Sequence, residues 1–185
     1  MVRDAEATKR RILDAAEEEF AKYGIAGARV DRIADTARAN KAMLYRYFDN
    51  KDRLFEEVFT QRVLALMDDT QFDATDLAGY AGRTFDLYQE HPNILRLTNW
   101  YILERGEVGQ IEMLIAAHRY KIGCIEQAQA EGFLPAGPPA IEILTAVRAL
   151  AMTWHTLTPE MVRAQLPDVA ARRASVVENV RRLFT

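Results

Sequence analysis

The sequence predicts an all-α protein in which a small N-terminal helix-turn-helix domain precedes a larger helical domain. Apolar residues recur at three- and four-residue spacing along most of the 185-residue chain. Strand signals, such as alternating β-branched runs and Asn-Gly or Asp-Gly hairpin turns, are missing from the sequence. The nine glycines and six prolines fall mostly between the periodic segments, where helices are expected to end.

The composition is that of a globular protein, with 49% hydrophobic and 28% charged residues. The single cysteine, Cys124, cannot form an internal disulfide, which suits a reducing cytosol. No apolar run reaches the roughly 18 residues that a membrane span needs. The charged N-terminus leads into no apolar signal segment. We therefore expect a cytoplasmic protein with no membrane partner.

Charge is distributed unevenly along the chain, whose formal net charge is −3. Lys and Arg outnumber Asp and Glu by 2 in residues 1–53, whereas the acids are in excess by 5 in residues 54–185. The overall acidity argues against a protein that coats nucleic acid indiscriminately. A basic end on an acidic remainder indicates that the N-terminal third faces nucleic acid.

The first predicted helix covers about 5–23 and is amphipathic. Ile12, Ala16 and Phe20 form its apolar stripe. Gly24 follows directly, at the position where a glycine commonly ends a helix.

Two short helices are predicted next, over 30–36 and 40–48, with a three-residue turn between them. Asn40 can cap the second one, because its side chain can accept a hydrogen bond from a free N–H group of the first helical turn. Asn50 can cap the following helix in the same way, and Thr158 with Pro159 can open a short helical turn. The other predicted helices cover 51–68, 77–90, 93–104, a long span ending near 131, 140–155 and 168–184, with a proline-rich loop at 132–139.

Residues 28–51, ARVDRIADTARANKAMLYRYFDNK, have the pattern of a DNA-binding helix-turn-helix. Apolar side chains such as Ile33 and Leu44 can lock the two helices at a fixed angle, and Ala34 is small where they would cross. The exposed face of the second helix carries side chains that can touch base edges and phosphates rather than fill a core.

These residues resemble the TetR family of bacterial transcriptional regulators. ILDAAEEEFAKYG at 12–24 looks like that family's first helix, and KAMLYRYFDNKDRLF at 41–55 looks like its third helix running into the fourth. The resemblance covers about 9–55. It implies a homodimeric repressor that leaves a palindromic double-stranded DNA operator when a small-molecule effector binds. It also implies a DNA-binding domain at 1–50, a ligand-sensing and dimerisation domain at 51–185, and no cofactor.

The resemblance implies phosphate contacts from Tyr45, Arg46 and Lys51, and Lys51 also begins a helix, whose free N–H groups bind anions. For Tyr45 the alternative is packing in the core. Arg29 and Arg32 flank the start of the preceding helix and are expected to reach the DNA backbone.

The base-facing positions of the family correspond to Lys41, Ala42 and Met43. Lysine can donate to guanine, and the apolar pair can meet thymine methyl groups. Asn40 can read adenine, although capping its own helix is the simpler role.

One residue departs from the family pattern, because Arg38 occupies the turn position that usually holds glycine. A left-handed backbone there costs a non-glycine residue about 1 kcal/mol. A phosphate contact would recover part of this cost, and the alternative is a solvated arginine with no role.

The resemblance implies that the C-terminal domain binds a small molecule, and aromatic and polar residues there suit such a cavity. Aromatic residues at helical spacing also commonly form the core, so both readings stay open. No strong zinc-ligand spacing is present, so we expect no metal. The candidate effector-binding residues are Phe85, Tyr88, Asn99, Trp100, Glu104, His118, Cys124 and Trp154.

Wide apolar stripes on the last two long helices fit a four-helix interface between two copies of the chain. The alternative is that they form the core of a single chain. The candidate interface residues are Ile143, Val147, Leu150, Val176, Val180 and Leu183.

Two other functions compete with a ligand-responsive repressor. The first is a small all-α enzyme, but no HExxH, CxxC, P-loop, GxSxG or GxGxxG motif is present. The second is a DNA-binding protein with no effector, which would have the same motif and a filled core. A cavity in the C-terminal domain, or thermal stabilisation by a compound, would distinguish a ligand-responsive repressor from a DNA-binding protein with no effector.

Overall fold

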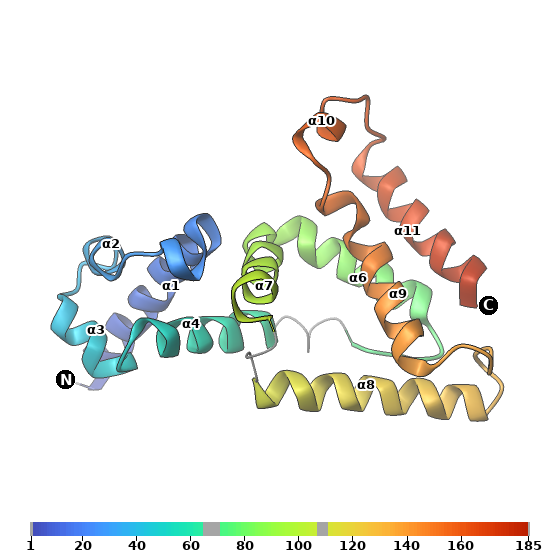
Figure 1. The fold of residues 1–185 in the computed structure, drawn as a ribbon, viewed down its shortest axis with the longest axis horizontal. Helices are drawn as coiled ribbons and strands as arrows, with labels where there is room; N and C mark the ends of the chain where they lie inside the picture. The colour runs from blue at the N-terminus through green and yellow to red at the C-terminus, as the bar shows by residue number, and fades with distance from the viewer. Residues whose placement is uncertain (1, 65–70, 107–110, 185) are drawn as a thin grey trace. The chain divides into compact units, whose positions relative to one another are not determined.

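The computed structural model describes residues 2–64, 71–106 and 111–184. The regular elements in these ranges are all helical, as predicted (Figure 1). The chain packs as two compact units. Unit 1 is Met1–Ala65 with Pro92–Ile111, and unit 2 is Leu66–His91 with Glu112–Thr185. Among the described residues, no helix is long and apolar enough to cross a membrane.

Unit 1 is built around aromatic side chains that lie between its helices. The rings of Phe20 and Phe55 meet edge to face with centroids 5.2 Å apart, and Tyr101 lies 4.8 Å from Phe59. Phe20, Phe55 and Phe59 are buried. The elements are α1 (Val2–Gly27), α2 (Val30–Thr36), α3 (Lys41–Phe48), α4 (Lys51–Phe59), the π-helical turn η1 (Thr60–Leu64) and α7 (Pro92–Arg105).

Unit 2 has an apolar core in which α6 packs against α9 and α11, and α8 packs against α9. An ion pair joins α6 to α11, where Arg173 Nε lies 2.8 Å from both carboxylate oxygens of Asp86. The elements are α6 (Leu77–Glu90), α8 (Glu112–Ala130), α9 (Ala140–Met152), the 3-10 turn η3 (Thr153–His155), α10 (Pro159–Val162) and α11 (Val169–Phe184).

Side-chain caps begin several of these helices, as the sequence predicts. Asn40 accepts from the backbone N–H of Met43 at 2.7 Å, and Asn50 accepts from that of Arg53 at 2.9 Å. Thr158 caps α10 through Met161 N–H. Asp76 and Asp168 cap α6 and α11 in the same way, which the sequence analysis did not predict.

Two predicted helices can be compared with the structure at their ends. The helix expected over 51–68 is α-helical only to Phe59 and continues as a π-helical turn to Leu64, and the rest lies outside the described residues. The first helix is broken at Gly24, where φ is 74°, and a further helical stretch follows to Gly27. Glycine tolerates this left-handed φ, so the predicted end of the helix is confirmed.

Candidate functional site

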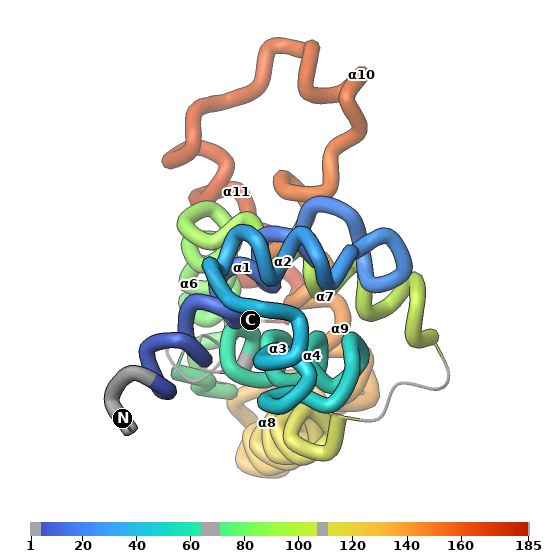
Figure 2. The backbone as a smooth tube through the Cα atoms, turned by 90° about the vertical axis from the view of Figure 1, so that its left-hand side faces the viewer, coloured from blue at the N-terminus to red at the C-terminus, as the bar shows by residue number. Residues whose placement is uncertain are grey.

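The chain turns from α2 into α3 (Figure 2), and the backbone of this turn has the geometry of a glycine-type helix end. Arg38 has φ 52°, its N–H donates to Asp35 O at 3.1 Å, and Ala39 N–H donates to Ala34 O at 2.9 Å. This pairing satisfies the last carbonyls of α2 and normally places glycine where Arg38 stands. The left-handed backbone considered from the sequence is therefore present.

The outer face of α3 carries most of the predicted DNA contacts. Lys41, Ala42 and Arg46 are exposed, and Tyr45 is 40% exposed, so Tyr45 is not a core residue. Met43 is half-buried. The opposite face packs inward through buried residues, namely Leu44 and Phe48.

Lys41 is paired with a neighbouring acid. Its ammonium lies 2.9 Å from the Asp31 carboxylate at the start of α2, and both side chains are exposed. The hydrogen bond and charge of Asp31 raise the pKa of Lys41. Exposed ion pairs of this kind contribute little to stability, so a DNA base or phosphate can take the place of Asp31 as the partner of Lys41.

Arg32 supports the fold through Glu19, a buried acid of α1. Glu19 accepts from the backbone N–H of Arg29 and from Arg32 Nε, both at 2.8 Å. Burial opposes ionisation of Glu19, but these bonds and the Arg32 charge outweigh it and lower the pKa of the carboxyl group. The guanidinium also lies over the Tyr23 ring. The role of Glu19 could not be predicted from the sequence, because its partners lie 10 and 13 residues further along the chain.

Lys51 also contacts the protein itself. Its Nζ donates to the carbonyl oxygens of Ala26 at 3.1 Å and Ala28 at 3.2 Å. An ammonium group has three N–H donors, so one is left for a phosphate. By contrast, the side chains of Arg29, Arg38 and Arg46 make no hydrogen bond or ion pair with the described part of the protein.

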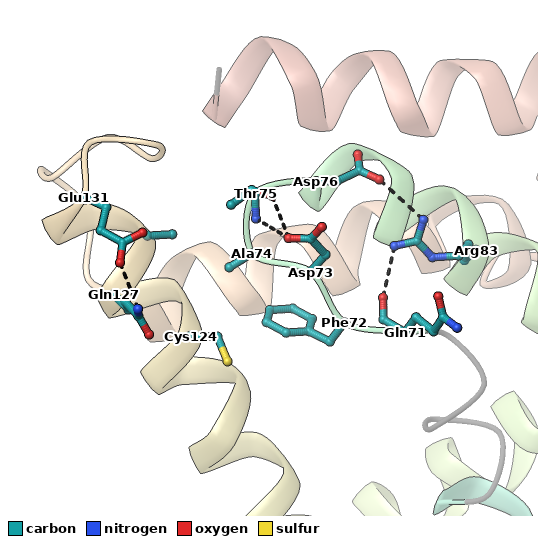
Figure 3. A pocket seen from close by; sticks show the side chains of 11 residues that line it. Gln71, Phe72, Asp73, Ala74, Thr75, Asp76, Arg83, Cys124, Gln127 and Glu131 are labelled. Carbon is teal, nitrogen blue, oxygen red and sulfur yellow. Dashed lines mark hydrogen bonds and ion pairs between the residues drawn. The ribbon is translucent and has the colours of Figure 1, made fainter.

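A pocket of about 560 Å³ lies in unit 2, between the segment before α6 and the face of α8 that carries Cys124 (Figure 3). Arg83 donates to Gln71 O at 3.1 Å and faces Asp76. The bonds from the Thr75 hydroxyl and N–H lower the pKa of Asp73. The charged residues that line the pocket are Asp73, Asp76, Arg83 and Glu131.

The N-terminal helices match the model of bacterial regulatory proteins of the tetR family over residues 12–58. Residues 76–182 match the model of the tetracyclin repressor-like C-terminal domain. The chain belongs to the TetR family. The resemblance stated from the sequence is therefore confirmed.

Similar proteins agree with this assignment. The HTH-type transcriptional repressor SCO4008 of Streptomyces coelicolor is 40% identical over 166 residues, which cover 87% of this chain and 84% of SCO4008. The solved structure of the transcriptional regulator SCO4942, also of Streptomyces coelicolor, has a TM-score of 0.85 and 39% identity, covering 96% of this chain and 98% of that one. The regulator FadR of Bacillus subtilis, solved with stearoyl-CoA, shares the fold with a TM-score of 0.62 and 21% identity, covering 92% of this chain and 96% of that one.

This TetR-family chain is a DNA-binding transcriptional repressor and not an enzyme. The segment that matches the C-terminal family model includes α7, yet α7 packs within unit 1 beside α1. The compact units thus divide the chain differently from the functional division at residue 50, which stays a prediction.

The predicted effector-binding residues are divided between the two units. Asn99, Trp100 and Glu104 lie on α7 in unit 1, where Trp100 Nε1 donates to Ala21 O and Glu104 accepts from two backbone N–H groups of α1. Trp100 and Glu104 thus bind backbone groups of α1 in the same unit. Residue type alone could not predict these bonds.

The other predicted effector-binding residues lie in unit 2, mostly in its core. Phe85 is 0% exposed, Tyr88 is buried, and both rings face His155. Trp154 packs against the same core. His118 Nε2 lies 2.8 Å from Arg148 Nη1. Among the eight, Cys124 alone lines the pocket of Figure 3. The remaining lining residues come from the segment 71–76, α6, α8 and Glu131 directly after α8, and the sequence analysis missed them.

Most of the predicted interface residues are buried within a single chain, as the intramolecular alternative describes, and a role for them in a dimer stays a prediction. Ile143 and Val147 are 0% exposed, and Val176 and Val180 are also buried. They fill the core between α6, α9 and α11, so the intramolecular alternative describes them. Leu150 packs against this core and is half-buried. Leu183 is 58% exposed and stays a candidate for contact with a second copy.

Proposed function

We propose that two copies of this repressor bind a palindromic operator, each placing α3 in a major groove. The observation that carries the proposal is the outer face of α3, which presents exposed Lys41, Tyr45 and Arg46 from a helix whose start is fixed by Asn40. Two-fold symmetry of the protein would be matched by two half-sites at least about 34–36 Å apart.

Each contact residue has a role in this complex. Tyr45, Arg46 and Lys51 contact phosphates, and Arg29 reaches the DNA backbone beside them. Arg32 acts mainly by holding Glu19, and its reach to the backbone requires it to leave that pair. Lys41 exchanges Asp31 for a base, with Ala42 and Met43 beside it and Asn40 at the helix start.

We further propose that a small molecule binds in unit 2 and releases the repressor from its operator. The pocket of about 560 Å³ is within the usual size range of ligand sites. The structure of FadR with stearoyl-CoA shows that a protein of this fold can hold a small molecule. A coupling of about 1–3 kcal/mol would change operator occupancy roughly 5–150-fold.

Selection of bound duplexes from a random pool tests the DNA proposal. Wild type should enrich a palindromic site bound by two protomers, and the Tyr45→Ala/Lys51→Ala variant should lose it. Arg119→Ala/Tyr120→Ala is a matched control, because it removes a cation and a tyrosine from exposed positions of α8. Enrichment of a site without two-fold symmetry, or equal binding by the Tyr45 and Lys51 variant, would contradict the proposal.

The effector proposal is tested with the selected operator and a compound library. Compounds that raise the thermal midpoint of unfolding should also lower operator affinity. If every stabilising compound leaves operator binding unchanged, the chain is a repressor without an effector.

A further inference from the structure

The break in α1 exposes backbone groups that a continuous helix would pair internally. Gly24 has φ 74° and ψ 179°, so the helix stops there and resumes at Ile25. Carbonyl oxygens before the break and N–H groups after it then need partners from outside the helix. These groups lie directly before α2, the first helix of the DNA-binding motif.

Side chains of α7 supply partners on both sides of the break. Arg96 Nε donates to Ala21 O at 2.6 Å, and Trp100 Nε1 donates to the same oxygen at 3.3 Å. Glu104 accepts from Ile25 N–H at 3.1 Å and from Ala26 N–H at 2.6 Å, one bond to each carboxylate oxygen. Bonds from N–H groups to a carboxylate are among the stronger protein hydrogen bonds.

The same break leaves no room for a side chain at Gly24. A Cβ there would lie 2.9 Å from Trp100 Cε3 and would also collide with the Glu104 carboxylate. The close approach of α7 and the left-handed φ at position 24 therefore each require glycine there.

Residues 25–28 are held from a second side by Lys51, at the start of α4. Its bonds to Ala26 O and Ala28 O complement the Glu104 bond to Ala26 N–H. The segment that leads into α2 is thus fixed by a carboxylate of α7 and an ammonium of α4. Asp52, next to Lys51, forms an ion pair with Arg105, next to Glu104, which ties the two helices together.

We propose that Glu104 is a positioning residue for operator binding, although it touches no DNA. By holding residues 25–28 it sets the direction in which the chain enters α2, and so the orientation of α3 relative to α1. The inference rests on the DNA-binding function alone and requires no effector. It also means that the chain segment matched by the C-terminal family model supplies part of the DNA-binding geometry.

Glu104→Gln distinguishes a positioning role from an effect of charge alone, because the two predict opposite changes in operator affinity. Removal of a negative charge from a DNA-binding protein should by itself strengthen binding to phosphates. Loss of one carboxylate–backbone bond should instead lower operator affinity by about tenfold. Glu104→Ala, which loses both bonds, should lower it further. Glu18→Gln is the matched control, since Glu18 is an exposed acid of α1 with no bond to the described residues.

Operator affinity is measured at 25 °C on the full chain, with the selected palindromic duplex and with the active fraction titrated. Thermal unfolding of the same samples shows that each variant is folded at that temperature. A purely structural role predicts unchanged affinity in the folded variants. The slope of log affinity against log salt should stay that of wild type, because no phosphate contact is lost.

Trp100→Phe gives a second variant that keeps an aromatic ring on α7 and removes the Nε1 bond to Ala21 O together with part of the indole. We expect it to lower operator affinity by about twofold to threefold. Wild-type or higher affinity in folded Glu104→Gln would overturn the proposal. If that variant does not fold, wild-type affinity of Trp100→Phe would overturn it. Wild-type affinity of Glu18→Gln would show that removing one negative charge from α1 does not by itself weaken operator binding.

Discussion

Each unit of this repressor has a buried apolar core of its own, and the units differ in what their polar bonds to the backbone hold in place. In unit 1, polar side chains bind backbone groups at helix ends, as Asn40 does for α3 and Glu104 does for the break in α1. In unit 2, the contacts between helices are mainly apolar, and Phe85 and Ile143 are 0% exposed in a shared core.

This difference predicts different responses to substitution. A polar bond to the backbone fixes a direction, and its net contribution to stability is small, about 1 kcal/mol. A buried apolar side chain of the unit 2 core contributes several times more to stability. Changes to the polar bonds at helix ends in unit 1 should therefore alter operator affinity more than stability, and changes in the unit 2 core should do the reverse.

The largest expected effect is that of Phe85→Ala in the unit 2 core. Removing a fully buried phenylalanine should lower the free energy of unfolding by about 3–5 kcal/mol, measured by urea denaturation. The operator affinity of the folded fraction should stay close to that of wild type. Phe133→Ala is the control, because Phe133 is 60% exposed and its removal should change stability by about 0.5 kcal/mol or less. Equal losses of unfolding free energy in the two variants would contradict the importance assigned to the unit 2 core.

Asn40→Ala removes the cap of α3 and should mainly affect DNA binding. We expect a loss of about 1 kcal/mol in unfolding free energy and a fall in operator affinity of about tenfold, because Lys41 and Met43 follow the cap directly. Thr158→Ala removes the same kind of cap from α10 in unit 2. If Thr158→Ala lowered operator affinity as much, caps in unit 1 would have no special role.

Arg38→Gly should stabilise the protein. The left-handed φ of 52° strains an arginine and suits glycine, so we expect a gain of up to about 1 kcal/mol in unfolding free energy. The salt dependence of operator affinity then separates the two interpretations of Arg38. An unchanged slope indicates a solvated arginine, and a slope shallower by about one indicates a phosphate contact. A loss of stability would show that strain at the turn is not the controlling factor.

The smallest expected effect is a loss of stability on mild acidification. His118 binds Leu114 O through Nδ1, and its Nε2 faces Arg148; burial and then the Arg148 charge lower its pKa from the ordinary 6.5. The unfolded chain therefore takes up a proton below pH 6.5 that the folded chain does not, and stability falls as pH drops below that value. His155, whose pKa burial also lowers, acts in the same direction.

Urea unfolding at pH 7.5 and at pH 5.5 measures this effect. His118→Gln should lose less stability between the two conditions than wild type does. His91→Gln, at an exposed position, should lose as much as wild type. Equal losses in all three proteins would contradict the assigned role of His118.

The sequence predicted local features well because they depend on neighbours in the chain. Asn40, Asn50 and Thr158 cap helices that begin one residue later, and each cap was predicted from residue type and position.

Contacts between distant segments could not be predicted from the sequence. Glu104 was assigned to an effector site, but it binds backbone groups 78 and 79 residues earlier in the chain. Periodicity correctly indicated that Val147 and Val176 are buried, yet it could not say that their partners belong to the same chain. Helical spacing shows which face of a helix is covered, and only the fold shows what covers it.

The most direct test of the account is the salt dependence of operator affinity for wild type and Arg46→Ala. Arg46 is an exposed cation of α3 that makes no ion pair with the described residues. We therefore assign a DNA phosphate as its partner. Log affinity should fall linearly with log salt for wild type, and the slope for Arg46→Ala should be shallower by about one. Arg119→Ala, on α8, should keep the wild-type slope. The same slope in wild type and Arg46→Ala would contradict the claim that this face of α3 meets the DNA backbone.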